Sequence, residues 1–262
     1  VSLGAVGELI VGSVQVSVIG AASRFEAPSL TNLRGTHYLS ASGGARVTLP
    51  SLLRYVQGNG DNWYWVRAEG DGSELHLPAL QLLEGSLGSA THIQAVSGGL
   101  VSLDTLSEVI TGIVQYEVSG VGSRLEAPQL TDLRGSQWFG VTGGAQVTLP
   151  VLRRFVQGSG NWYWLHVEGA GSVLDLPTLD HIEASLDSVT HIQVYGGGQL
   201  KLGALKELVT GTLVMDVSGD GTQNEDPDCG AAVNCGAVQL QRDLSALAGI
   251  TVNGLAIGGA AI

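Results

Sequence analysis

The chain has 262 residues, of which 39 are glycine, 44% are hydrophobic and only 14% are charged. This composition is poor for long solvent-facing helices and typical of many short strands joined by tight turns. The formal net charge is −12 and the only lysines are Lys201 and Lys206, so the chain lacks the basic stripe that nucleic-acid binding requires. No apolar run approaches the roughly 18 residues of a membrane-spanning helix, and we expect no membrane span in this segment.

A unit of about 100 residues occurs twice in the chain. The segment SRFEAPSLTNLRG returns as SRLEAPQLTDLRG, GGARVTLPSLLRYVQG returns as GGAQVTLPVLRRFVQG, and NWYWVRAEG returns as NWYWLHVEG. We place the two copies at residues 4–103 and 104–202. A single repetitive architecture is therefore expected over residues 1–217.

Each long unit contains four shorter repeats, in which an alternating apolar stretch is followed by a turn residue, a leucine, a second apolar stretch and a glycine. The turn residues lie 22 to 28 positions apart. They are Gly4, Pro28, Pro50, Pro78, Asp104, Pro128, Pro150, Pro177 and Gly203. Periods of this length indicate solenoids or propellers, and a propeller blade needs about 40 residues. A leucine-rich repeat would also require a recurring Asn ladder, which is missing.

We therefore predict an all-β fold, a parallel β-helix (solenoid) of nine to ten coils of 22–28 residues with a four-coil unit duplicated. Proline suits the first corner of each coil because it lacks the N–H that a central ladder demands. Alternation in residues 114–118 predicts that Val114, Tyr116 and Val118 point into the core. Glycines are expected at positive φ in the next corner; examples are Gly43, Gly70, Gly120, Gly143 and Gly169.

The coil patterns VTLPxLxxFVxG and LDLPxLxxIxxS resemble those of right-handed parallel β-helices and of the related receptor L-domain coils of secreted and cell-surface proteins. The resemblance covers roughly residues 1–217 and concerns the residue pattern of the repeats rather than a catalytic signature. It implies right-handed, three-sided coils and a secreted or cell-surface location. Such coils serve in adhesins, surface layers and carbohydrate-active enzymes, and the resemblance does not choose among them.

The pattern breaks at residues 218–237 and resumes in residues 238–262 as a further coil or the end of the solenoid. Cys229 and Cys235 are the only cysteines and have no zinc-site pattern around them, so we expect a disulfide and an oxidising compartment. A chain that opens at Val1 rather than Met is expected to be processed or part of a longer protein. The same loop is rich in oxygen ligands for calcium, without the EF-hand spacing, and a solvated acidic loop is the alternative. The candidate ligands are Asp220, Asn224, Asp226 and Asp228.

Alternation on the last strand of each coil predicts two outward patches of aromatic and polar side chains. The first patch contains Tyr38, Trp63, Trp65, Glu69, His92 and Gln94. The second patch contains Trp138, Trp162, Trp164, His166, Glu168, His191, Gln193 and Tyr195. Because the duplicates are four coils apart, the patches should be separated by about 19 Å.

Indole faces beside Gln, Glu and His suit sugars, so we interpret the chain as an adhesion or binding module whose partner is a glycan or another surface protein. One alternative is a structural rod in which the aromatics only pack. Another is a polysaccharide lyase or hydrolase using Glu69 with Glu117, about 10 Å apart, or the duplicate pair Glu168 with Asp216. An open, flat face does little to raise a carboxyl pKa, and no GxSxG or HExxH motif is present, so we expect no enzyme and no cofactor other than calcium.

Overall fold

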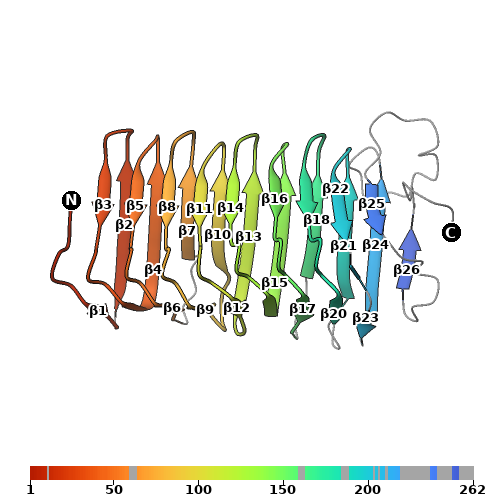
Figure 1. Cartoon of the computed structure of the whole chain (residues 1–262), viewed down its shortest axis with the longest axis horizontal. Coiled ribbons are helices and arrows are strands. Elements are labelled where there is room, and N and C mark those ends of the chain that lie inside the picture. The colour runs from red at the N-terminus through yellow and green to blue at the C-terminus, as the bar shows by residue number, and fades with distance from the viewer. Residues whose placement is uncertain are drawn as a thin grey trace.

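The structure, a computed structural model, describes residues 1–10, 12–58, 64–158, 163–183, 189–202, 204–205, 207–209, 212–218, 237–240 and 250–253. Within these ranges, the side-chain surroundings of residues 36, 64–65, 136–137, 163–164, 189 and those after 205 are not described. All regular elements in the described residues are β-strands, and they stack into an elongated parallel β-solenoid (Figure 1). These residues contain no helix with the length and hydropathy needed to cross a membrane.

Three faces run along the solenoid, and we name them A, B and C in the order in which the chain visits them. Face A consists of short strands that pair in parallel within two sheets. Its strands are β3 (Arg24–Glu26), β5 (Arg46–Thr48), β8 (Glu74–His76), β11 (Leu100–Ser102), β14 (Arg124–Glu126), β16 (Gln146–Thr148), β19 (Val173–Asp175), β22 (Gln199–Leu202) and β25 (Ala237–Leu240).

Face B carries strands that follow the proline corner. They are β1 (Glu8–Leu9), the first part of β4 (Asn32–Ser42), β6 (Arg54–Gln57), β9 (Leu82–Glu84), β12 (Glu108–Val109), the first part of β15 (Asp132–Thr142), β17 (Arg154–Gln157), β20 (His181–Glu183) and β23 (Glu207–Val209). Each strand pairs in parallel with the equivalent strand of the next coil, as β4 does with β6.

Face C carries the longest strands. They are β2 (Ser13–Ile19), the second part of β4, β7 (Tyr64–Glu69), β10 (Thr91–Val96), β13 (Ile113–Ser119), the second part of β15, β18 (Tyr163–Glu168), β21 (Val189–Tyr195), β24 (Thr212–Ser218) and β26 (Ile250–Asn253). Faces B and C belong to one sheet because β4 and β15 run through both.

Glycine allows β4 and β15 to turn from face B to face C without a loop. Gly35 has φ +130° and Gly135 has φ +92°. A Cβ atom on Gly35 would lie 2.5 Å from the carbonyl oxygen of Gly12, and one on Gly135 would lie 2.9 Å from that of Gly112. Since real Cβ atoms do not approach backbone oxygen this closely, only glycine fits either bend.

The other corners have the turn chemistry that the sequence predicts. At the proline corner, the carbonyl of Leu49 accepts a hydrogen bond from the amide of Leu52 across Pro50, which sets φ at the second position of the turn. At the corner between faces C and A, the glycines expected at positive φ all have it, with values between 61° and 91°. The prediction of these corners is confirmed.

The core is a set of apolar ladders that run the length of the solenoid. Val114, Tyr116 and Val118 are fully buried, as predicted from alternation in β13. The rings of Tyr116 and Phe139 stack across neighbouring coils with centroids 5.1 Å apart. Each fully buried aliphatic side chain stabilises the fold by roughly 1.5–3 kcal/mol, so the stacking of coils is driven mainly by this interior.

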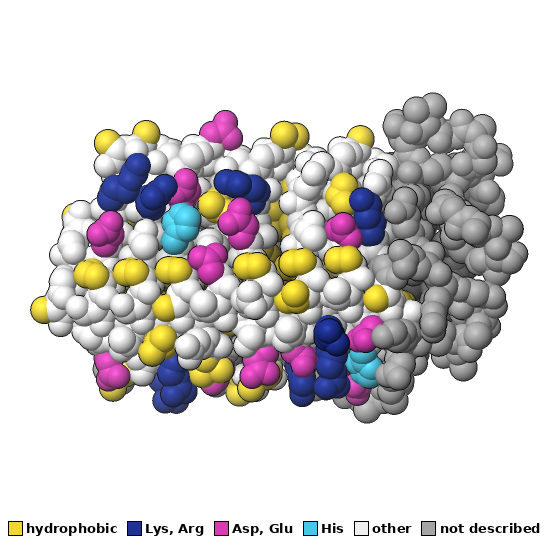
Figure 2. Space-filling view, viewed as in Figure 1, with side chains coloured by type: hydrophobic (Ala, Val, Ile, Leu, Met, Phe, Trp, Pro, Cys, Tyr) yellow, Lys and Arg dark blue, Asp and Glu magenta, His cyan; other side chains and the backbone are white. Residues whose placement is uncertain are grey.

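Outside the core, face A is a mixed charged surface. Figure 2 shows Lys and Arg side chains beside Asp and Glu side chains on the side seen in that view. Glu74 illustrates the pairing, because its carboxylate lies between Arg46 and His76 and is 2.9 Å from His76 Nε2. Its pKa is lowered, first by the hydrogen bond from His76 and then by the charge of Arg46.

Seven consecutive coils cover all three faces and have a described core; five of them have three strands, and in the other two β4 or β15 serves both face B and face C. The seven coils span residues 24–42, 46–69, 74–96, 100–119, 124–142, 146–168 and 173–195. Before them, β1 and β2 form only two faces of a coil, and after them β22 to β26 continue the parallel pairing as backbone. The prediction of nine to ten complete coils is therefore too high for the described structure. The turn residues used for that count include those of the two end regions.

Candidate functional site

The outer side of face C carries two rows of side chains that cross the strands in register. The first, which we call the aromatic row, contains Gln15, Tyr38, Trp65, His92, Gln115, Trp138, Trp164 and His191. The second, which we call the polar row, contains Ser17, Ser40, Arg67, Gln94, Glu117, Gly140, His166 and Gln193. The aromatic row repeats after four coils with only Tyr38 changed, to Trp138, whereas in the polar row only Gln94 recurs, as Gln193.

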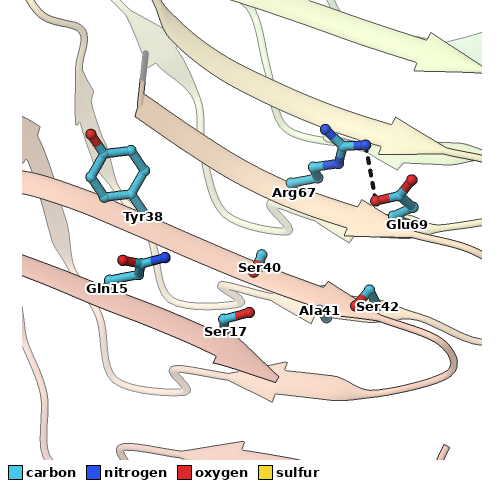
Figure 3. Close-up of a pocket in the computed structure, with 8 residues that line it drawn as sticks. All are labelled: Gln15, Ser17, Tyr38, Ser40, Ala41, Ser42, Arg67 and Glu69. Carbon is cyan, nitrogen blue, oxygen red and sulfur yellow. Dashed lines mark ion pairs between the residues drawn. The ribbon is translucent and has the colours of Figure 1, made fainter. Parts of the chain in front are cut away.

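A hollow opens on this face where β2, β4 and β7 lie side by side (Figure 3). It encloses about 320 Å³. Its small side chains are Ser17, Ser40 and Ser42, and longer side chains stand around them. The longer ones are Gln15, Tyr38, Arg67 and Glu69. An aromatic ring, hydroxyls, an amide and an ion pair thus surround one shallow space.

The Arg67 side chain links the hollow to the next two strands. Its Nη2 lies 2.9 Å from Glu69 Oε2, and its Nη1 donates to Gln94 Oε1 over 3.3 Å. Gln94 Nε2 then donates to Glu117 Oε2 over 2.6 Å. Each of the two carboxylates proposed for catalysis is therefore paired with a donor, Glu69 with Arg67 of its own strand and Glu117 with Gln94 of the neighbouring strand, an arrangement suited to ordering the surface.

The second copy of the hollow has different side chains at equivalent positions. Glu117 replaces Ser17, Gly140 replaces Ser40, and His166 replaces Arg67. The indole of Trp138 lies over Gly140, with Cζ2 3.8 Å from the position that a Cβ atom would take there. The Trp138 Nε1 atom is buried and has no hydrogen-bond partner in the described structure.

The contacts of His166 differ from those of Arg67. His166 Nε2 lies 3.1 Å from Glu168 Oε2, and its ring meets the edge of Tyr195 at a centroid distance of 5.7 Å. The amide oxygen of Gln193, which corresponds to the oxygen that Arg67 reaches on Gln94, is buried without a partner. The second copy therefore has an unsatisfied donor in Trp138 and an unsatisfied acceptor in Gln193.

The predicted outward orientation is correct for part of the candidate set. Glu69 and Glu168 are exposed, whereas Tyr38, Trp138, His166 and His191 are half-buried on the outer face. The register places Trp65 and Trp164 in the aromatic row, but their side-chain surroundings lie outside the description. Trp63 and Trp162 lie outside the described residues altogether.

Four candidates were expected on an exposed surface and are buried instead. The exposed fractions are 3% for His92, 7% for Gln94, 4% for Gln193 and 4% for Tyr195. They are on the outer side of the sheet, but the side chains of the flanking strands cover them, as Arg67 and Glu117 do for Gln94. Burial lowers the pKa of His92 to about 4, so this imidazole is neutral at physiological pH.

The proposed disulfide and calcium residues cannot be placed. Cys229, Cys235, Asp220, Asn224, Asp226 and Asp228 all lie outside the described residues. Within the part of the chain that is described, no cluster of three or more His, Cys, Asp or Glu side chains could hold a metal ion.

Sequence reasoning missed the hollow itself. Gln15, Ser17, Ser40 and Ser42 line it, but none was selected as a candidate. The signal was present, because β2 reads SVQVSVI and alternates between small polar and apolar residues. The same alternation rule, applied to the two coils before the first tryptophan, would have placed these side chains on the outer side.

The fold and this surface define the class: an internally duplicated parallel β-solenoid with a repeated aromatic and polar face. Comparison of the chain with protein-family models, with curated protein sequences and with solved structures gives no match. The function must therefore be argued from the surface chemistry of face C.

Proposed function

We propose that the chain is an extracellular or cell-surface adhesion module that binds glycans on face C. The proposal also takes up the resemblance to receptor L-domain and right-handed β-helix coils, for which secreted and surface locations are typical. Its chemical basis is the pairing of aromatic rings with amide, hydroxyl and charged groups, because pyranose rings present C–H faces to aromatics and hydroxyls to polar groups.

The observation that carries the proposal is the hollow between β2, β4 and β7. Its volume of about 320 Å³ is at the lower end of the ~300–1,000 Å³ typical of small-ligand sites, which suits one or two sugar units. Tyr38 offers a ring face at its border, while Ser40 and Arg67 supply hydrogen-bonding groups within it (Figure 3). A shallow site of this kind fits binding to an exposed polymer better than enclosure of a small metabolite.

A glycan array followed by calorimetry tests the proposal. Ser40→Leu should fill the hollow and lower the affinity for any bound glycan by about tenfold or more, or roughly 1.4 kcal/mol. Thr48→Leu is the matched control, because Thr48 is on β5 of face A and a leucine there leaves face C unchanged. Both variants must keep the wild-type circular dichroism spectrum and melting temperature.

Two outcomes would contradict the proposal. One is the absence of binding to every glycan on the array by the folded wild-type chain. The other is binding that Ser40→Leu and Thr48→Leu affect equally, because the contact surface would then lie elsewhere.

The proposed location has its own test. A secreted or surface protein would keep Cys229 and Cys235 oxidised, since disulfides persist in oxidising compartments. Intact-mass measurement of protein from its native source, with and without reductant, should differ by two hydrogens. An unchanged mass would remove the argument from cysteine.

A structural spacer is the second candidate, and the burial of Gln94 and Gln193 on the outer face favours it. In that case face C orders the coils rather than receiving a ligand. Replacement of Gln94 by Ala would then lower the melting temperature, while the wild-type protein would bind no glycan. The two candidates therefore differ in binding rather than in stability.

A further inference from the structure

We propose that face C is a bivalent site, in which one extended β-1,4-linked glycan chain lies along the solenoid axis and contacts both halves of the duplication at once. This inference rests on the proposed glycan-binding function and adds the class of ligand, its direction and its minimum length. It uses only residues whose side chains are described.

The direction follows from the strand register. Tyr38 on β4 and Trp138 on β15 occupy the same place along their strands and are connected through β7, β10 and β13. Four strand steps of about 4.8 Å separate them by about 19 Å. The line between the two aromatic side chains therefore crosses the strands and follows the long axis of the solenoid seen in Figure 1.

The ligand class follows from this spacing. In an extended β-1,4-linked chain the length of one pyranose unit is close to one strand spacing, so successive units can face successive coils. Such chains are also flat, with C–H groups on both faces that can stack on aromatic rings. A helical or strongly branched glycan would leave the line between Tyr38 and Trp138 after one contact.

The two halves keep the groups that such a chain would use. Gln15 beside Tyr38 recurs as Gln115 beside Trp138, in the same register on the neighbouring strands. In the first half the ring borders the serines of the hollow, and in the second the indole lies over Gly140, where the lack of a side chain lets the ring pack against the sheet.

Between the two aromatic positions, the polar row supplies a continuous hydrogen-bonded track. Glu69, Arg67, Gln94 and Glu117 are linked one to the next across β7, β10 and β13. This network fixes the surface that separates the two contact points, so little flexibility is lost when a chain spans them. A ligand bound at one end is thus presented to the other at a high effective concentration.

The test compares tetramers and octamers of β-1,4-linked glucose and of β-1,4-linked N-acetylglucosamine by calorimetry. A tetramer covers one half and should bind twice per chain, whereas an octamer covers both and should bind once, about 100-fold more tightly. Sedimentation must show that the octamer complex contains one protein chain, so that the gain is not due to bridging of two molecules.

Variants of the described aromatic residues sharpen the test. Tyr38→Ala or Trp138→Ala alone should lower the affinity for the octamer to that for the tetramer and reduce tetramer binding to one site. The double variant should bind neither. Gln146→Ala, an exposed change on face A, is the control and should leave both affinities unchanged.

Failure of the inference differs from failure of the proposed function. If tetramers bind and octamers bind no more than roughly fivefold more tightly, with two octamers per chain, the sites act separately and bivalency is wrong. If neither length of either glycan binds while the array reports another glycan, the ligand class is wrong. If the wild-type chain binds no glycan at all, both the function and this inference fail.

Discussion

The two halves of the solenoid share one backbone plan and differ in how their polar groups are satisfied. Both bend from face B to face C at a glycine, Gly35 or Gly135, against a glycine of the preceding coil. In the first half, Arg67 connects Glu69 to Gln94, whereas in the second His166 contacts Glu168 and the oxygen of Gln193 has no partner among the residues whose side chains are described. Duplication has preserved the glycines of the bends and changed most side chains of the polar row.

The interiors of the two halves also differ in their buried polar groups. Tyr55 in the first half donates to the carbonyl of His37 and accepts a hydrogen bond from Gln57, while Phe155 takes the equivalent place in the second half. Gln57 also makes hydrogen bonds to the backbone N–H and C=O of His37. A polar cluster therefore supports the first bend, and apolar packing takes a larger part in the second.

The largest expected effect comes from changing the bends themselves. Gly35→Ala should lower the free energy of unfolding by at least roughly 2–3 kcal/mol, because a Cβ atom would meet the Gly12 carbonyl at positive φ. Gly135→Ala should lower the free energy of unfolding by nearly as much. Gly4→Ala is the control, since nothing lies within 4 Å of its Cβ position. If urea unfolding gives Gly35→Ala and Gly4→Ala the same free energy of unfolding, the backbone at the bend accommodates a Cβ atom without cost.

Sequence alone could predict these bends only in part. Repeat length, proline corners, positive-φ glycines and alternation are local signals, so they predicted the class of fold and core residues such as Val114 and Val118. The burial of Gln94 depends on Arg67 and Glu117, which reach it from neighbouring coils. That contact requires the register between coils of unequal length, which no local pattern specifies. Alternation could place the residues of the hollow on the outer side of their strands, but their grouping beside Arg67 and Glu69 depends on the same register.

The next largest effect concerns His92, which lies in the first half of the duplication. The pKa of His92 is about 4 in the folded state against an ordinary 6.5, because burial disfavours the charged imidazole. The unfolded chain therefore takes up this proton first, and the free energy of unfolding should fall by up to about 3 kcal/mol as pH decreases from 6.5 to 4. His37, which is also buried with a lowered pKa, acts in the same direction.

Thermal melts between pH 7.5 and 4.5 check this prediction. His92→Gln should reduce the loss of stability at low pH, whereas Gln115→Ala, a change in the same row at a side chain that does not ionise, should leave the profile as in the wild type. If the melting temperature of the wild type and of His92→Gln changes equally with pH, protonation of His92 does not lower the stability of the folded state.

A smaller and opposite pair of effects is expected from two buried tyrosines. Tyr55→Phe should lower the free energy of unfolding by about 1 kcal/mol, because its hydroxyl is hydrogen-bonded and Phe155 shows that the shape is accepted. Tyr116→Phe should raise it by a similar amount, since its hydroxyl is buried without a partner in the described structure. Chemical denaturation that gives both variants the same sign would contradict the hydrogen-bond assignment.

The smallest effect would make the second half resemble the first. His166→Arg should let a guanidinium contact both Glu168 and the unpartnered oxygen of Gln193, as Arg67 does with Glu69 and Gln94, and should raise the free energy of unfolding by about 1 kcal/mol. His166→Lys is the control for charge, because an ammonium lacks the planar fork that contacts two acceptors. If urea unfolding at pH 7.5 shows Lys to stabilise as much as Arg, the gain comes from charge near Glu117 and Glu168. If only Arg stabilises, the missing hydrogen bond to Gln193 is what distinguishes the two copies, and the second half has kept an unsatisfied acceptor that the first half does not have.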